Sequence, residues 1–402
     1  MNRRHFFGLT GAAAAGSAVA SLSSAPAFAA TDMQKQMKIT GIETDILHFP
    51  PGRIFYDAIH EFGAAHGGLA VRIHTDAGIT GWGSSDFGML PGGPDAVQDI
   101  IQNAIKPVIV GQDPAFQKRL RADMWKALEY ASVVGLNQFA ISVCETAIWD
   151  IIGKAYGVPV YKLLGPYADR IPGYAMCGWY YPNDSDNSQY KKELESAVEE
   201  GFGAVKIKVG RYSLDDDVAR IKMAQQVAGP NRRVMVDANQ KFSVAEAILR
   251  GKVYQDLGCY WLEEPIVPYD HAGYARISEE LQLRIAGGEN EYTKYSFADF
   301  ISRHCVSIVQ PDGRRAGGVS EWMEIGALAD AAGLPIASHG GGPADMQMLL
   351  AMPNAIYMES GSFRGKSSTL EQLRMVDSHI LAPVLPGMGT ELRPDYLAKH
   401  KA

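Results

Sequence analysis

Three short apolar runs decide the fold of this chain: VMVDAN (234–239), YWLEEP (260–265) and RIAGGE (284–289). Each apolar run is closed by an acidic residue, and Asp237, Glu263 and Glu289 follow one another at intervals of 26 residues. An interval of this length holds one strand, one helix and two loops, so the chain returns each time to the same edge of a parallel sheet. We therefore expect the three carboxylates to meet at the carboxyl ends of neighbouring strands.

These three acids, called the carboxylate trio below, predict a metal site. Three carboxylates cannot share a small volume unless a cation neutralises them. Ligation by oxygen alone suits a hard divalent ion such as Mg²⁺. Single surface acids are common, but three unrelated ones would not keep an even register. The trio is therefore predicted to bind Mg²⁺.

From Ile171 onward, strand-like and helical segments alternate. The strand-like segments end near Met176, Lys208, Asp237, Glu263, Glu289, Asp312, His339 and Glu359. Helical patterns lie between them, at 190–200, 214–227, 244–257 and 319–332. Eight strands with interposed helices predict a TIM-type barrel. Because no clear amphipathic helix follows Glu359, we expect a modified TIM barrel of the (β/α)₇β type over residues 166–365.

The chain before the barrel predicts a smaller N-terminal α+β domain over residues 37–165. Lys38–Phe49 and Leu69–Thr75 have the pattern of strands, and a turn and a third strand follow them. Helical patterns come next, at 94–109, 115–129 and 136–156. The loop Pro50–Gly68 is rich in aromatic residues and histidine. We expect this domain to cap the barrel, and residues 366–402 to pack back on the cap.

Residues 1–30 have the pattern of a targeting segment. Arg3 and Arg4 precede a weakly apolar stretch, and Ala27-Phe28-Ala29 offers a cleavage site. The arginine pair is typical of a twin-arginine signal, which predicts a periplasmic protein. An ordinary secretory signal or an N-terminal anchor is the alternative. No other apolar run approaches the roughly 20 residues that span a bilayer, so we expect no membrane contact after signal removal.

Composition indicates a soluble globular protein. Apolar residues make up 47% of the chain and charged residues 21%. The net charge of −7 and the lack of Lys/Arg-rich runs give no footprint for nucleic acid. The four cysteines are widely separated and include no CxxC pair, so we expect buried free thiols rather than a disulfide framework.

Lys206 and Lys208 occur in AVKIKVG (204–210), two residues apart on a predicted strand. Their side chains would point to the same face. Alone, such a pair more often marks an exposed face, but beside the carboxylate trio we expect both inside the barrel. Buried lysines need compensating charge. A divalent cation nearby would lower the pKa of a lysine, which makes a general base near neutral pH.

His339 ends LPIASH, and Asp312 ends SIVQPD one βα unit earlier. Adjacent strand ends would place the two side chains within hydrogen-bond reach. A carboxylate on one imidazole nitrogen fixes the tautomer and raises the basicity of the other nitrogen. A lone histidine is more often structural, whereas this pair predicts an acid/base group that faces the metal.

Two further strand-end residues are candidates. Glu359 either forms a salt bridge at the rim or, if protonated, donates a hydrogen bond to a developing oxyanion. Asn239 either contacts a metal-bound substrate or caps the next helix. Arg314 and Arg315 are interpreted as a solvated loop pair rather than as a site for a distal acidic group. The chain has no dinucleotide, P-loop or HExxH motif.

Together these residues resemble the enolase superfamily, and within it the mandelate racemase/muconate lactonizing enzyme family. The motifs that carry the resemblance are AIWDIIGKAYGVPVYKLLG (147–165), KIKVG (206–210), VDANQ (236–240), EEP (263–265), GGE (287–289), QPDGRRAGG (310–318) and SH (338–339). The resemblance covers about residues 37–394. The muconate-cycloisomerase-like branch has a lysine base on the sixth barrel strand. Asp312 stands there in this chain, paired with His339, which indicates the mandelate racemase-like branch and its acid-sugar dehydratases.

The resemblance implies removal of the proton α to a carboxylate. Mg²⁺ on the carboxylate trio would bind the substrate carboxylate and stabilise the enediolate. Lys206 would assist at the carboxylate oxygen, while Lys208 and His339 would face opposite sides of the α-carbon. Glu359 would hydrogen-bond to the enediolate. The Pro50–Gly68 loop would set specificity and exclude water.

Three outcomes stay open. If a β-hydroxyl leaves with His339 as acid, the enzyme dehydrates an acid sugar to a 2-keto-3-deoxy acid, which is the more frequent activity in the resembling group. If a proton returns to the α-carbon, it is a racemase or epimerase of an α-hydroxy acid. A periplasmic carboxylate-binding protein without turnover is the third alternative. The presence of both Lys208 and His339 argues against it. The resemblance also implies a homo-oligomer.

Overall fold

An antiparallel sheet opens the described part of the chain, which the computed structural model gives for residues 37–87 and 90–402. Its strands are β1 (Ile39–Phe49), β4 (His66–Thr75) and β5 (Thr80–Asp86), in the order β1-β4-β5. The small hairpin β2 (Phe55–Tyr56) and β3 (Glu61–Phe62) interrupts the connection from β1 to β4. The targeting segment predicted over residues 1–30 lies outside the described residues and stays a prediction.

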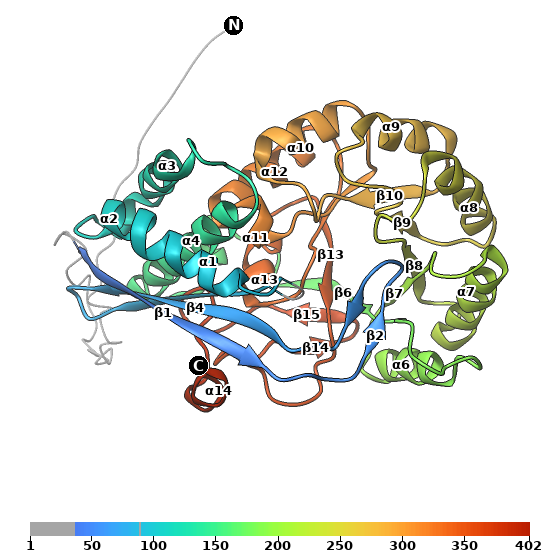
Figure 1. Ribbon diagram of the computed structural model, residues 1–402, viewed down its shortest axis with the longest axis horizontal. Helices are drawn as coiled ribbons and strands as arrows, with labels where there is room; N and C mark the ends of the chain where they lie inside the picture. Colours follow the sequence, from blue (N-terminus) through green and yellow to red (C-terminus); the bar gives the residue numbers. More distant parts are fainter. Residues whose placement is uncertain (1–36, 88–89) are drawn as a thin grey trace, which may run out of the picture. The chain divides into compact units, whose positions relative to one another are not determined.

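Helices pack on this sheet to form the cap (Figure 1). They are α1 (Gly93–Ile100), a π-helical turn (Ile101–Ile105), α2 (Lys106–Ile109), α3 (Gln117–Leu128) and α4 (Leu136–Ala155). A short 3₁₀ turn (Pro114–Phe116) precedes α3. Two glycines let β5 lie directly on α4. A Cβ at Gly81 would come within 2.0 Å of the Ala147 carbonyl oxygen, and one at Gly83 within 2.1 Å of that of Val143.

Eight parallel strands close into the barrel that the sequence predicts. They are β6 (Arg170–Met176), β7 (Ala204–Lys208), β8 (Arg233–Asp237), β9 (Trp261–Glu263), β10 (Arg284–Gly287), β11 (Ile308–Val309), β12 (Ile336–Ala337) and β13 (Ala355–Ser360). Pairing of β13 with β6 completes the ring. The connecting helices surround it in Figure 1: α6 (Ser188–Glu199), α7 (Leu214–Ala228), α8 (Val244–Asp256), α9 (His271–Glu280), α10 (Thr293–Ser302), α11 (Gly313–Ala316), α12 (Val319–Ala331) and α13 (Pro343–Leu349). The fold is the (β/α)₇β barrel with an N-terminal α+β domain.

Alternation along the strands separates the two sides of the barrel wall. On β7, Val205 and Ile207 join the apolar layer between strands and helices, whereas Lys206 and Lys208 belong to the opposite face. A second apolar cluster fills the barrel interior and includes Tyr174, Met235, Trp261 and Tyr357. The Tyr174 and Trp261 rings meet edge-on, with centroids 5.2 Å apart. This packed floor leaves the carboxyl ends of the strands for polar groups.

The tail after β13 contains more structure than its sequence predicts. β15 (His379–Leu381) pairs antiparallel with β6 and with β14 (Met375–Val376). The helix α14 (Pro394–His400) follows, and the backbone N–H of Ala402 donates to the Ile46 carbonyl of β1 at 3.0 Å. In the sequence, the short helix α5 (Tyr161–Leu164) connects the last helix of the cap to the first strand of the barrel.

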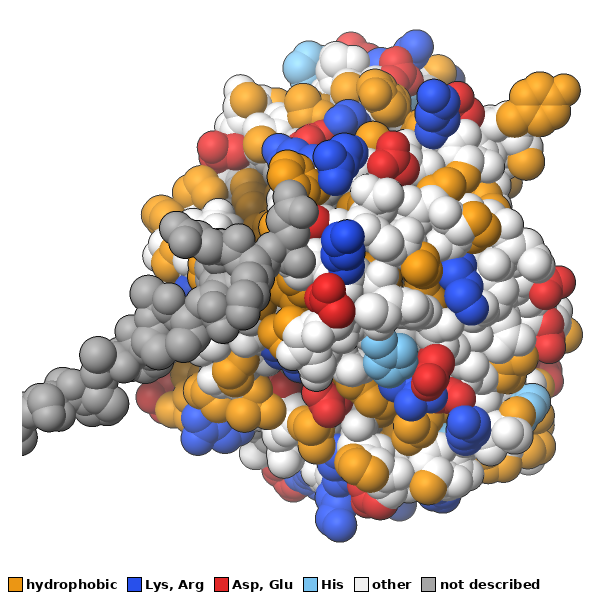
Figure 2. All heavy atoms as spheres, turned by 90° about the vertical axis from the view of Figure 1, so that its left-hand side faces the viewer, with side chains coloured by type: hydrophobic (Ala, Val, Ile, Leu, Met, Phe, Trp, Pro, Cys, Tyr) orange, Lys and Arg blue, Asp and Glu red, His pale blue; other side chains and the backbone are white. Residues whose placement is uncertain are grey.

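The surface of the described residues carries mixed charge. On the face in Figure 2, basic, acidic and apolar side chains are interspersed without a continuous field of one sign. All four cysteines are buried free thiols, as the sequence predicts. None of the described helices combines the length and apolarity needed to cross a bilayer.

Candidate active site

The carboxylate trio lies at the carboxyl ends of three neighbouring strands. Asp237 of β8 stands in register with Glu263 of β9, and Glu263 in register with Ala286 of β10. Glu289 follows the end of β10 by two residues. All three carboxylates are buried. Across residues 37–87 and 90–402, however, no group of three or more His, Cys, Asp or Glu side chains is gathered closely enough to hold a metal ion as it stands.

Two buried lysines from β7 contact the trio instead. Lys208 Nζ donates to Asp237 Oδ2 at 2.6 Å. Lys206 Nζ forms an ion pair with Glu263 and lies 2.6 Å from Glu359 Oε1. Burial acts to lower the pKa of Lys208, but the charge of Asp237 outweighs it, so the pKa lies above its ordinary value. The chain alone therefore holds Lys208 protonated, and a base at this position requires that the Asp237 charge be neutralised by another cation.

His339 and Asp312 form the predicted pair. Their backbones meet in a parallel bridge, and His339 Nδ1 lies 2.8 Å from Asp312 Oδ2. The other ring nitrogen, Nε2, lies 3.4 Å from Glu289 Oε2. Burial acts to lower the pKa of His339, but Glu289 and the hydrogen bond to Asp312 raise it to about 9. The ring thus has one nitrogen fixed by Asp312 and the other directed at the trio.

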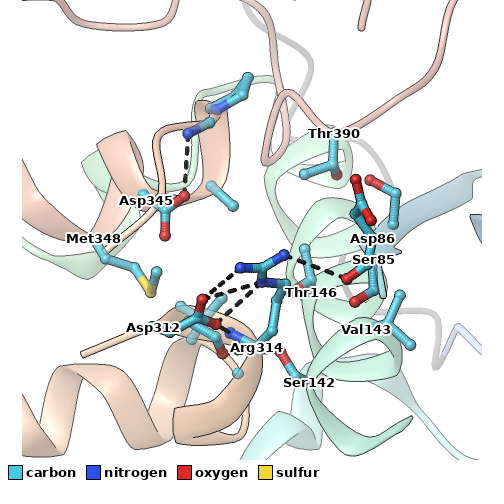
Figure 3. A pocket seen from close by; sticks show the side chains of 18 of the residues that line it. Ser85, Asp86, Ser142, Val143, Thr146, Asp312, Arg314, Asp345, Met348 and Thr390 are labelled. Atoms are coloured by element: carbon cyan, nitrogen blue, oxygen red, sulfur yellow. Dashed lines mark hydrogen bonds and ion pairs between the residues drawn. The ribbon is translucent and has the colours of Figure 1, made fainter. Parts of the chain in front are cut away.

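The arginines after Asp312 are not a solvated loop pair, so that interpretation is wrong. The Arg314 guanidinium turns back on Asp312, with Nη2 2.6 Å from Oδ2 and Nε 3.1 Å from Oδ1 (Figure 3). The backbone N–H groups of Arg314 and Arg315 also donate to Asp312 Oδ1, at 2.8 and 3.1 Å. Arg315 reaches the Glu289 carbonyl at 3.2 Å. A cavity of about 280 Å³ lies beside this cluster, between α4 and the glycine-rich loop 340–342.

The structure bears on the two alternatives that the sequence left for Glu359 and on the two that it left for Asn239. Glu359 forms an ion pair with Lys206, with Oε1 2.6 Å from Nζ, which corresponds to the salt-bridge alternative. Burial acts to raise the pKa of Glu359, but Lys206 and His339 hold it below its ordinary value. Glu359 also accepts from the backbone N–H of Gly340 at 2.6 Å. Asn239 does not cap α8, because Ser243 does so. The Asn239 Oδ1 atom is buried without a hydrogen-bond partner, which leaves the predicted contact with a substrate open.

Sequence reasoning missed two neighbours of Glu263. Trp261 Nε1 donates to Glu263 Oε2 at 3.1 Å, and Gln310 Nε2 donates to the same oxygen at 2.9 Å. The signal for Trp261 was present, because it lies two residues before Glu263 on β9 and residues two apart on a strand share a face. Gln310 lies just beyond the end of β11, where this alternation no longer applies. The second acid of EEP, Glu264, points elsewhere and accepts from Asn290 Nδ2 at 2.8 Å.

The donor set of the trio fits a hard divalent cation. Burial raises the pKa of Glu263 to about 7; Lys206 works against the rise, whereas the charges of Asp237, Glu359 and Glu289 add to it. Negative charge also exceeds what the lysines compensate, because Lys206 and Lys208 are shared among the buried carboxylates of Asp237, Glu263 and Glu359. Carboxylate oxygens on rigid neighbouring strands are the ligands that Mg²⁺ prefers.

Comparison with known protein families agrees with this geometry. The mandelate racemase / muconate lactonizing enzyme N-terminal domain matches residues 62–165, and the enolase C-terminal domain-like description matches residues 189–396. The fold and the site thus define an enolase-type barrel enzyme with a capping domain. The chain belongs to the mandelate racemase/muconate lactonizing enzyme family of the enolase superfamily.

Individual relatives carry different activities in their names. An arabinonate dehydratase of Saccharolobus solfataricus is 32% identical over 83% of this chain and 90% of its own length. A 3,6-anhydro-α-L-galactonate cycloisomerase of Streptomyces coelicolor is 30% identical over 88% of this chain and 97% of its own length. Among solved structures, a racemase from Streptomyces coelicolor with bound magnesium superimposes with a TM-score of 0.84 at 29% identity, and covers 90% of this chain and 100% of its own.

Proposed function

We propose that this protein is a Mg²⁺-dependent hydro-lyase that removes the proton α to a carboxylate and dehydrates an acid sugar to a 2-keto-3-deoxy acid. One observation carries the proposal. The two acid/base groups contact the two ends of the carboxylate trio, Lys208 at Asp237 and the His339–Asp312 pair at Glu289. A small carboxylic acid held at the trio would therefore lie between them. The arabinonate dehydratase among the relatives supports the same reaction.

Each side chain has a role in such a reaction. Lys208 takes the α-proton, and Lys206, held by Glu263 and Glu359, places positive charge beside the developing enediolate. His339 gives its proton to the β-oxygen as the carbon–oxygen bond breaks, so that water leaves and the enol tautomerises to the 2-keto-3-deoxy acid. Mg²⁺ on the trio would supply the charge that makes the α-proton acidic.

The test is proton NMR in D₂O, with the purified protein, Mg²⁺ and a library of acid sugars and α-hydroxy acids. We expect loss of the α-proton signal together with a 2-keto-3-deoxy product. His339→Asn should abolish dehydration but leave α-proton exchange through Lys208, whereas Lys208→Met should lose both.

His74→Asn is the matched control, because His74 is also paired, with Thr80 and Glu43, but lies in the cap sheet. Exchange of the α-proton with inversion at the α-carbon, without loss of water, would show that the enzyme is an epimerase and not a dehydratase. Full dehydration by His339→Asn would remove His339 from the mechanism.

A further inference from the structure

A second cavity lies at the amino-terminal end of the barrel, away from the carboxylate trio. Its volume is about 710 Å³, which is within the range of small-molecule sites. Its lining includes Arg233 at the start of β8, Tyr260 just before β9 and Arg284 at the start of β10. These neighbouring strands are the ones whose other ends lead to the trio (Figure 1). The cavity, called the basal cavity below, is therefore separated from the candidate active site by the length of a strand.

Every charged side chain that lines the basal cavity is positive. These side chains are Arg232, Arg233 and Arg284, and no Asp or Glu lines the cavity with them. Across residues 37–87 and 90–402, none of the three arginines forms an ion pair with a carboxylate. The chain as a whole carries a net charge of −7. A cavity with three uncompensated cations in an acidic protein attracts an anion.

The Tyr260 ring holds two of the guanidinium groups. The guanidinium carbon of Arg233 lies 4.1 Å from the centroid of this ring, and that of Arg284 lies 4.7 Å from the same centroid. A guanidinium that lies over an aromatic ring keeps its N–H donors at its edge. Arg233 Nη1 donates to the Tyr357 hydroxyl at 3.3 Å, whereas Arg284 has no hydrogen-bond partner within the described part of the chain. The two groups are positioned, and most of their donors remain available to a ligand.

Backbone carbonyl groups hold the third arginine. Arg232 Nε donates to the Phe202 carbonyl at 2.8 Å, and Nη1 donates to the Ala228 carbonyl at the end of α7 at 3.1 Å. Its positive charge is thus fixed at the wall of the basal cavity. Groups that are already positioned lose little further freedom when a ligand binds.

We propose that the basal cavity binds a phosphate group. Two guanidinium groups on different strands can each take a pair of oxygens from a tetrahedral phosphate, whereas a planar carboxylate offers only one pair. A phosphate monoester carries a charge of about −1.5 to −2 at pH 7, which offsets the charge of two arginines. Inorganic phosphate and a small phosphate ester share this chemistry. The proposal is independent of the proposed function, because it uses none of the residues that take part in the reaction.

Calorimetric titration of the purified protein tests the inference. The matched probes are glucose 6-phosphate and glucose, which differ only in the phosphate group, and inorganic phosphate is the free ion. We expect at least one of the two phosphates to bind with a Kd of about 1 mM or tighter, and glucose to bind more weakly than glucose 6-phosphate by at least about tenfold. The tighter of the two phosphates identifies the ester or the free ion as the source of the group.

Three variants locate the binding. Arg284→Gln removes the guanidinium that has no other hydrogen-bond partner and should weaken phosphate binding about tenfold or more, with circular dichroism showing an intact fold. Arg284→Lys keeps the charge without the planar fork and should recover part of the affinity. Arg276→Gln changes an exposed arginine of α9 outside the basal cavity and should bind phosphate as the natural chain does.

The titrations are run with and without Mg²⁺, because a phosphate that bound through a metal at the carboxylate trio would require the metal. Binding that depends on Mg²⁺ overturns the inference. The absence of phosphate binding, equal affinity for glucose and glucose 6-phosphate, or an unchanged affinity in Arg284→Gln also overturns it.

Discussion

The side chain of Arg314 keeps Asp312 of the Asp312–His339 pair ionised. Burial alone would raise the pKa of Asp312, but the Arg314 charge and the hydrogen bond from His339 hold it well below its ordinary value. Asp312 therefore stays ionised and can fix the Nδ1 proton of His339. Figure 3 shows the guanidinium directed at both carboxylate oxygens. In this role Arg314 is a positioning residue, because it acts on His339 through Asp312.

Arg314→Met should lower turnover by about 10- to 100-fold, since a hydrogen bond to a charged group contributes about 1.5–3 kcal/mol. The downfield proton resonance of His339 Nδ1 can be assigned by its absence in His339→Asn. We expect this resonance to disappear in Arg314→Met as well. Arg314→Lys keeps the charge without the planar fork and should recover part of both. Arg303→Met, at a surface arginine paired with Asp299, is the control. An unchanged resonance in Arg314→Met would mean that the backbone alone positions Asp312.

The residues at the strand ends could be predicted from the sequence, whereas contacts between distant elements could not. The carboxylate trio, Lys206 and Lys208 follow from period-two alternation and from the even spacing of βα units, both of which are local. The contact of Phe55 with Trp179 joins residues from the cap and the barrel, so no local pattern encodes it. The Arg314 contact with Asp312 is local in the sequence. An arginine two residues after an aspartate is, however, equally compatible with a solvated side chain in a loop, so the sequence did not predict the contact.

The close packing of β5 on α4 predicts that alanine substitutions at two glycines of the same sheet will change the stability of the protein to different extents. Gly83→Ala would drive a Cβ to 2.1 Å from the Val143 carbonyl oxygen, whereas a Cβ at Gly41 would meet nothing within 4 Å. Overpacking of this kind costs about 1–3 kcal/mol. We expect thermal unfolding to show a clear loss for Gly83→Ala and at most a small change for Gly41→Ala. Equal melting temperatures would show that β5 can move away from α4 at little cost.

The cap and the barrel meet through buried charged groups. Glu145 of α4 accepts from the backbone N–H of Ser320 at 3.2 Å, and a Cβ at Gly318 would come within 2.0 Å of Glu145 Oε2. Arg121 of the cap pairs with Glu321 of α12 at 3.0 Å. Burial raises the pKa of Glu145 from 4.5 to about 7, although Arg121 and Ser320 oppose it. The folded state therefore binds a proton at Glu145 that the unfolded chain releases near pH 4.5.

This pKa difference sets the direction of a pH effect on stability. Because the folded pKa lies above the unfolded one, the stabilisation that Glu145 contributes is complete below about pH 4.5 and is lost as the pH rises through about 7. Glu145→Gln mimics the protonated form at every pH, so the melting temperature of the variant relative to the natural chain should rise by a few degrees from pH 5 to 8. Glu129→Gln, at an exposed position, should track the natural chain throughout. A difference between Glu145→Gln and the natural chain that stays constant from pH 5 to 8 would mean that Glu145 is ionised in the folded cap across that range, with Arg121 and the Ser320 N–H outweighing the cost of burial.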